Sequence, residues 1–124
     1  MLKIVVGGQI NKKEIFDYIQ KYYGTENVKL EIKNDLDAVM AMQAGQFDYY
    51  IGACNTGGGG ALAMAIALLG ATKCKTISMP GKILPDEEIK KAVDDGIVAF
   101  GFTASHMEQV LPVLLDAIDH KNYY

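Results

Sequence analysis

Strand-like and helix-like patterns of apolar and polar residues alternate along the whole chain. Val28–Ile32 alternates apolar and polar side chains as a half-buried strand does, whereas Leu2–Val6 is a short apolar run. Ala61–Leu69 is the longest uninterrupted apolar run, and we interpret it as a helix that is apolar on every side. The pattern predicts strands at Leu2–Val6, Val28–Ile32, Phe47–Ala53, Lys75–Met79 and Ile97–Phe102, with helices between them and after the last.

Capping signals support two of these helices. Asn11 and Glu14 have the spacing of a capping box at the start of the first helix, and Ser105 and Glu108 have it before the last. Pro112 lies inside the last helix, where its missing N–H and its ring break or bend the backbone. We therefore expect a side-chain cap at Asn11, and a kink or a restart at Pro112.

The alternation of strands and helices indicates a single α/β domain over residues 1–124. Its expected architecture is a three-layer, doubly wound fold around a five-stranded, mainly parallel sheet, Rossmann- or flavodoxin-like, in the order 2-1-3-4-5. Such sheets bind ligands where the connections that leave two neighbouring strands diverge to opposite faces. That crevice would bring the loops Gly7–Asn11 and Cys54–Gly60 together.

Four consecutive glycines, Gly57–Gly60, stand between the third strand and the apolar helix. The start of a helix leaves about four N–H groups without intrahelical partners, and glycines there let an anion approach the main chain. No lysine follows the glycines as in a Walker A loop, and no acidic residue ends the next strand as a dinucleotide site requires. We predict an anion-binding loop; the alternative is that the glycines permit tight packing or a sharp turn.

The predicted ligand-binding residues come from these loops and from the end of the fourth strand. They are Gly7, Gly8, Gln9, Asn11, Asn55, Thr56, Gly57, Gly58, Gly59, Gly60 and Lys82. Asn11 is equally needed as a helix cap, and a solvated surface position is the alternative for Lys82.

Two further side chains are catalytic candidates. Cys54 ends the third strand beside a helix start, where the pKa of a thiol is lowered, so it could act as a general base or a nucleophile. The alternative for Cys54 is a small buried residue at a strand end. His106 could act as a general acid–base group, although histidines in the first turn of a helix are commonly surface residues.

The amino-acid composition limits which classes of partner the protein can bind and indicates its cellular compartment. The net charge of −3 argues against a nucleic-acid or membrane-surface role, because both need a basic face. All twelve cationic residues are lysines, which leaves main-chain amides, lysine charges and hydroxyls to bind an anion. The two cysteines and two histidines have no metal-ligand spacing, so we expect neither a metal nor another cofactor. With no export signal and no run long enough for a bilayer, we expect a cytoplasmic protein with free thiols.

The apolar helix Ala61–Leu69 needs cover on every side, and one face of a sheet covers only half of it. A symmetric homodimer through this helix is the simplest way to bury the rest. Burial within one chain is the alternative, and it is weaker because a chain of 124 residues has few helices to spare.

The segments VGGQINKKEI, YYIGACNTGGGGALAMAIALLG, TISMPGK and VAFGFTASH resemble a bacterial family known only as domain of unknown function 2620. This resemblance extends over the whole chain and implies no established activity. Locally, DYYIGACNTGGGGALAMA is similar to the cysteine-glycine loop of ribose-5-phosphate isomerases of the B type. That likeness implies that Cys54 transfers protons, that the amides of residues 56–60 stabilise an enediolate, and that dimers share the sites. The Asp-His pair of those enzymes is replaced here by Gly7, Gly8 and Gln9, and their phosphate-binding arginines are absent.

Two classes of function follow from these residues. In the enzymatic class, Cys54 removes a proton next to the carbonyl group of an anionic small metabolite, in the manner of an isomerase, and glycine amides hold the oxyanion. In the other class, the chain is a non-catalytic regulatory or transport-associated subunit that binds the metabolite. A purely structural oligomer is a third possibility.

Overall fold

The computed structural model describes residues 1–55 and 58–123, with the backbone alone for 58–61. The strands are Leu2–Gly8 (β1), Val28–Ile32 (β2), Tyr49–Cys54 (β3), Cys74–Thr76 (β4), Ser78–Met79 (β5), Lys82–Ile83 (β6) and Ala99–Thr103 (β7). The α-helices are Lys12–Tyr23 (α1), Asp35–Gln43 (α2), Gly58–Leu69 (α3), Asp86–Asp94 (α4) and Met107–Tyr123 (α5). Two short 3₁₀ turns, Ala71–Lys73 (η1) and Ala104–His106 (η2), connect them.

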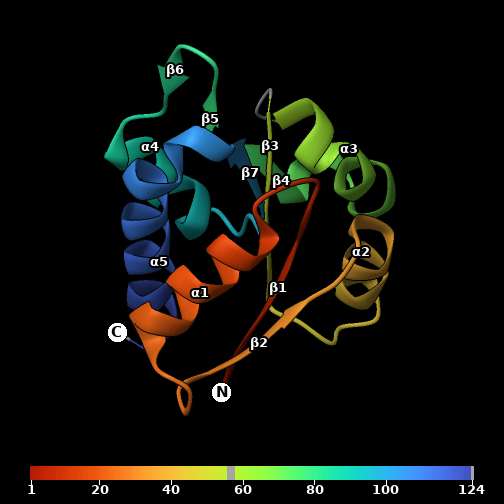
Figure 1. Cartoon of the computed structure of the whole chain (residues 1–124), viewed down its shortest axis with the longest axis vertical. Helices are drawn as coiled ribbons and strands as arrows, with labels where there is room; N and C mark the ends of the chain where they lie inside the picture. Colours follow the sequence, from red (N-terminus) through yellow and green to blue (C-terminus); the bar gives the residue numbers. More distant parts are fainter. Residues whose placement is uncertain (56–57, 124) are drawn as a thin grey trace.

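The main sheet has five parallel strands in the order β2-β1-β3-β7-β4. Helices α1, α4 and α5 cover one face, and α2 and α3 cover the other (Figure 1). The three-layer, doubly wound α/β fold predicted from the alternation of strands and helices is therefore confirmed. The neighbouring positions of the first three strands are confirmed with it.

The predicted order of the last two strands is wrong. The order 2-1-3-4-5 placed the fourth strand beside β3, whereas β7 takes that position and β4 forms the edge of the sheet. The reason lies in burial, because β7 is buried at all five positions while β4 is three residues long and exposes Lys75. A central parallel strand is covered on both faces and must be apolar, whereas an edge strand tolerates a lysine.

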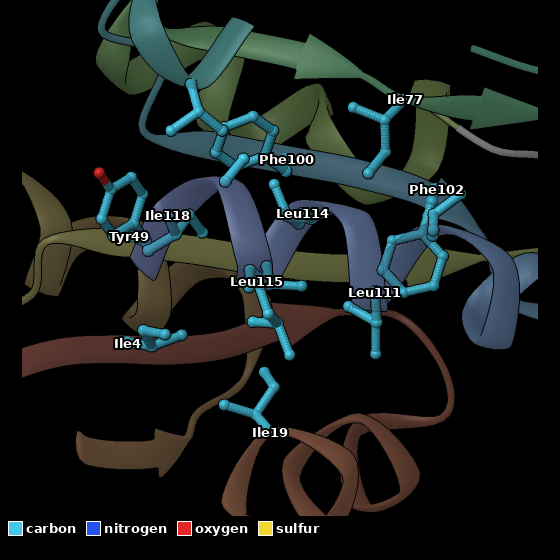
Figure 2. Close-up of a cluster of buried hydrophobic side chains, with 14 of the residues drawn as sticks. Ile4, Ile19, Tyr49, Ile77, Phe100, Phe102, Leu111, Leu114, Leu115 and Ile118 are labelled. Atoms are coloured by element: carbon cyan, nitrogen blue, oxygen red, sulfur yellow. The ribbon is translucent and has the colours of Figure 1, made fainter. Parts of the chain in front are cut away.

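The larger part of the core lies between the sheet and α5. Figure 2 shows the leucines of α5 packed against β7, with β1 and α1 on their other side. The side chains at the centre are wholly buried: Ile4, Ile19, Ile77, Phe100, Phe102, Leu111, Leu114, Leu115 and Ile118. Of the two outcomes expected at Pro112, a kink or a restart, the restart is wrong, because α5 is one continuous helix. Leu111 and Leu114 hold it to the sheet on both sides of the proline.

The starts of α1 and α2 differ in how they are capped. The side chain of Asn34 accepts a hydrogen bond from the amide of Asp37 at 2.8 Å, as a cap does. Asn11 adopts a left-handed conformation (φ 56°) and makes no side-chain cap hydrogen bond. The predicted capping box at Asn11 is therefore wrong, because a capping side chain requires the extended backbone that Asn34 has.

The outer face of α3 is apolar and exposed. Leu62 and Ala65 are buried against the sheet, whereas Ile66 and Leu68 are 43% and 37% exposed. Burial of the whole helix within one chain, the alternative to a dimer, is therefore wrong. The homodimer through Ala61–Leu69 stays a prediction.

We expect Ile66→Lys to convert a dimer into a monomer, because a symmetric interface would bury this lysine twice. Light scattering over a concentration series should give about twice the chain mass of 13.5 kDa for the wild type and the chain mass for the variant. Ile83→Lys is the matched control, since Ile83 is 40% exposed on β6 and should leave the mass unchanged. A wild type that stays at the mass of one chain would contradict the dimer.

Candidate functional site

The carboxyl ends of β1, β3 and β7 meet at one edge of the sheet, beside the start of α3 (Figure 1). Gly8 pairs with Ala53, and Cys54 pairs with Thr103. The loop after β1 is tied to β3, because the amides of Gln9 and Ile10 both donate to the carbonyl oxygen of Ala53, at 2.9 and 3.3 Å. The predicted meeting of the loops that leave the first and third strands at one edge is therefore confirmed for the described residues, and two amides of the first loop are used within the protein.

Cys54 and Thr103 face the side of the sheet that α2 and α3 cover. Side chains alternate along a strand, and Tyr50 and Ala99, four residues before each of them, belong to the core on that side. Thr103 is only 6% exposed, and its Oγ1 has no hydrogen-bond partner among the described residues. A buried hydroxyl without a partner costs free energy, so Thr103 is the position here that most needs an explanation.

Helix α3 begins next to this pair. It packs on β3, β7 and β4, and its first turn is formed by Gly58–Gly60, three of the four predicted glycines. The first N–H groups of a helix have no intrahelical partner and carry partial positive charge. Cys54, Thr103 and the start of α3 thus bring together a thiol, a hydroxyl without a partner among the described residues, and a helix end that favours anions.

Ser78 joins this edge from β5. Its Oγ accepts a hydrogen bond from the amide of Thr103 at 3.0 Å and lies 3.0 Å from Nδ1 of His106. Ser78 is 1% exposed, whereas His106 is partly exposed on η2. His106, predicted as a candidate from its place after the last strand, therefore has a buried partner that directs its ring.

Sequence reasoning missed Ser78 as a site residue. Its partners lie 25 and 28 residues further along the chain, and no local motif marks a contact of that kind. The predicted order already placed the fourth and fifth strands side by side, and the contact depends on their register, in which Thr76 pairs with Gly101 two residues before Ser78 and Thr103. No signal in the local sequence fixes that register, so the contact of Ser78 with Thr103 was not predictable from the sequence.

A second polar pair lies between β3 and α2. The hydroxyl of Tyr50 donates to Asp35 Oδ1 at 2.5 Å, and the whole tyrosine is buried. Burial, together with Asp35, raises the pKa of Tyr50, so the phenol remains protonated and remains a donor. A Cβ at Gly7 would lie 2.5 Å from Cε2 of this ring, so packing alone accounts for the glycine at that position.

The other predicted ligand-binding residues are spread over this end of the molecule. Gln9 and Asn55 are exposed, Asn11 is partly exposed, and Lys82 is exposed on β6, in the same hairpin as Ser78. Thr56 and Gly57 lie outside the described residues. Cys74 is buried in the core, as predicted, and its burial raises the pKa of its thiol. Within residues 1–55 and 58–123, no three His, Cys, Asp or Glu side chains are grouped as a metal ion would require.

The chain has relatives in sequence and in fold. A family model described as "Protein of unknown function DUF2620" matches residues 2–118. The "Uncharacterized protein YhfU" of Escherichia coli (strain K12) and that of Shigella flexneri are each 49% identical over 85 residues, which is 68% of this chain and 73% of theirs. The crystal structure of a ribose 5-phosphate isomerase from Thermotoga maritima aligns with a TM-score of 0.66 and 14% identity, over 94% of this chain and 85% of that chain.

These likenesses bear on two of the expectations from the sequence. The resemblance to domain of unknown function 2620 is confirmed over almost the whole chain. The likeness to the isomerases is confirmed as a likeness of fold, which is all that 14% identity carries.

Proposed function

The chain belongs to the DUF2620 family, whose function is unknown, and on that premise we propose that it binds an anionic small metabolite, phosphorylated or carboxylated, at the carboxyl edge of its sheet. The ligand lies against the start of α3, Cys54 and Thr103. Open α/β sheets bind ligands at this edge, and a fold shared with a sugar-phosphate isomerase is consistent with the same place. No helix among the described residues is long and apolar enough to cross a membrane. Cys54 and Cys74 are thiols and not a disulfide, which suits a reducing cytoplasm, the compartment we propose.

The observation that carries the proposal is the hydroxyl of Thr103. Its Oγ1 is buried and has no hydrogen-bond partner in the part of the chain that the structure describes. A ligand oxygen would accept the hydrogen of this hydroxyl and remove the cost of burying it alone. The neighbouring N–H groups at the start of α3 favour a negatively charged ligand over a neutral one.

In the enzymatic form of the proposal, Cys54 as thiolate removes a proton from a carbon next to a carbonyl group. The electron pair of that C–H bond forms the double bond of an enediolate, and the carbonyl oxygen takes the negative charge. The N–H groups at the start of α3 hold this oxyanion. The hydroxyl hydrogen on the first carbon then moves to this oxyanion, and the thiol returns its proton to the former carbonyl carbon. The first carbon becomes the new carbonyl group, so the overall change is an isomerisation and needs no oxidant.

We expect Cys54→Ser to abolish turnover while it preserves ligand binding. A serine keeps the size of the side chain but is far too weakly acidic to act as a base, so proton transfer should fall about a hundredfold or more. The reaction is followed by NMR as deuterium incorporation into ribose 5-phosphate in D₂O, and binding as shifts of backbone amide signals during titration with inorganic phosphate or acetate. Equal loss of exchange and of binding would contradict the role of Cys54 as base.

The non-catalytic alternative predicts a different result from the same measurements. The wild type would bind inorganic phosphate or acetate without exchange of any carbon-bound proton, and Cys54→Ala would bind as the wild type does. Cys74→Ala is the matched control for loss of a buried thiol. Cys74 lies in the core and pairs with Ala99 at the start of β7, whereas Cys54 pairs with Thr103 at the end of that strand. A wild type that binds neither anion would contradict both forms.

A further inference from the structure

The side-chain oxygen of Ser78 makes hydrogen bonds with both Thr103 and His106. We propose that Ser78 is a positioning residue that holds His106 in the tautomer protonated at Nε2, so that Nε2–H donates a hydrogen bond to the bound anion. This inference rests on the proposed function for the identity of the ligand. The tautomer itself is independent of that function.

Counting donors and acceptors assigns the proton. A serine hydroxyl has one hydrogen to donate and two lone pairs to accept with. One lone pair of Ser78 accepts the amide hydrogen of Thr103, and the residue is 1% exposed, so water cannot take the hydroxyl hydrogen. Nδ1 of His106, at 3.0 Å, is the acceptor that the described residues provide. Nδ1 is therefore unprotonated, and the ring carries its hydrogen on Nε2.

The same distances would suit a nucleophilic serine with a histidine base. The burial of Ser78 argues against that role. A nucleophile must reach the reacting atom of its substrate. The oxygen of Ser78 is enclosed and already accepts the amide of Thr103. Its role is therefore to orient its neighbours, and the residue it orients, His106, is partly exposed.

The geometry also ties His106 to the rest of the proposed site. The amide nitrogen of Thr103 and Nδ1 of His106 each lie 3.0 Å from the same atom, Oγ of Ser78, so Ser78 connects the two residues directly. Among the described residues, Thr103 has the buried hydroxyl without a partner. Ser78 thus holds the ring of His106 beside the residue whose hydroxyl we propose meets the anion.

The tautomer is tested by long-range ¹H–¹⁵N NMR of the imidazole rings above neutral pH. The chain has only two histidines, so His106→Gln and His120→Gln assign the signals. We expect a protonated Nε2 and an unprotonated, hydrogen-bonded Nδ1 in His106, and a shift of the Nε2 signal when inorganic phosphate is added. A proton on Nδ1, or signals averaged between the two tautomers, would overturn the inference.

The positioning role is tested by coupling between two variants. We expect Ser78→Ala to weaken phosphate binding about three- to tenfold and His106→Ala about tenfold, as the loss of a hydrogen bond to a charged group does. If Ser78 acts through His106, the double variant should bind no more weakly than His106→Ala alone. Ser78→Thr keeps the hydroxyl and should restore the tautomer. Additive losses in the double variant would contradict the role of Ser78.

Failure of this inference is distinguishable from failure of the proposed function. Phosphate that shifts the amides of Gly58–Gly60 while leaving the His106 ring unchanged overturns the contact with His106 and leaves the proposed function standing. Absence of any phosphate or acetate binding overturns the proposed function and the contact with the anion, while the wild-type ring spectrum still decides the tautomer. If Ser78→Ala fails to fold, as thermal unfolding would show, the wild-type spectrum and His106→Ala decide the matter.

Discussion

Replacing Gly8 with alanine will destabilise the protein by roughly 3–5 kcal/mol, from left-handed backbone strain together with overpacking. Gly8 has φ +78°, a conformation that side chains rarely adopt. A Cβ there would lie 2.7 Å from the backbone nitrogen of Ala53 and 2.9 Å from its oxygen. Backbone in the middle of a sheet cannot move aside, so β1 and β3 would separate where the first loop meets the site. Urea unfolding monitored by circular dichroism measures the loss.

The matched control for Gly8 is Gly45→Ala. Gly45 has nearly the same φ, +76°, but a Cβ there would have nothing within 4 Å. The alanine then introduces backbone strain without a clash, so the cost should be about 1–2 kcal/mol. Equal free energies of unfolding for the two variants would show that the clash of the added Cβ with Ala53, which is present only at Gly8, has no effect.

Replacing Phe100 with alanine will destabilise the protein by about 3–5 kcal/mol, the range for truncating a buried aromatic side chain. Phe100 is 0% exposed and is the second residue of β7. Its ring centroid lies 6.4 Å from that of Tyr49, and Figure 2 shows it beside Leu114 on the side that α5 covers. The surrounding strands and helix can close such a cavity only in part, so the loss includes a cavity term as well as a transfer term. The measurement is again urea unfolding.

Phe16→Ala provides the same truncation in a partly buried setting. Phe16 lies on α1 at the margin of the same core. Because its ring is already in part hydrated, the cost should be well below that of Phe100→Ala. A loss at Phe16 as large as that at Phe100 would contradict the view that β7 forms the centre of the fold.

The candidate site was predictable in part. Cys54, His106 and Gly58–Gly60 were predicted because strand ends and helix starts carry signals in the local sequence. The partners that complete the arrangement were not predicted: Ser78, the buried hydroxyl of Thr103, and the pair of Tyr50 with Asp35. Each of these depends on the register between strands or on which face a strand residue takes. Such contacts join residues far apart in the chain and leave no short motif.

By itself, the sequence determined the class of the fold, the places of its five main strands, the closeness of the first and third, and the glycine-rich start of α3. Those features follow from local periodicity and capping, which act over a few residues. Only the tertiary structure decided that β7 and not β4 lies beside β3, and that Asn11 turns left-handed and does not cap. Both choices are made by competition for burial and for hydrogen bonds among distant segments, and that competition is settled when the sheet assembles.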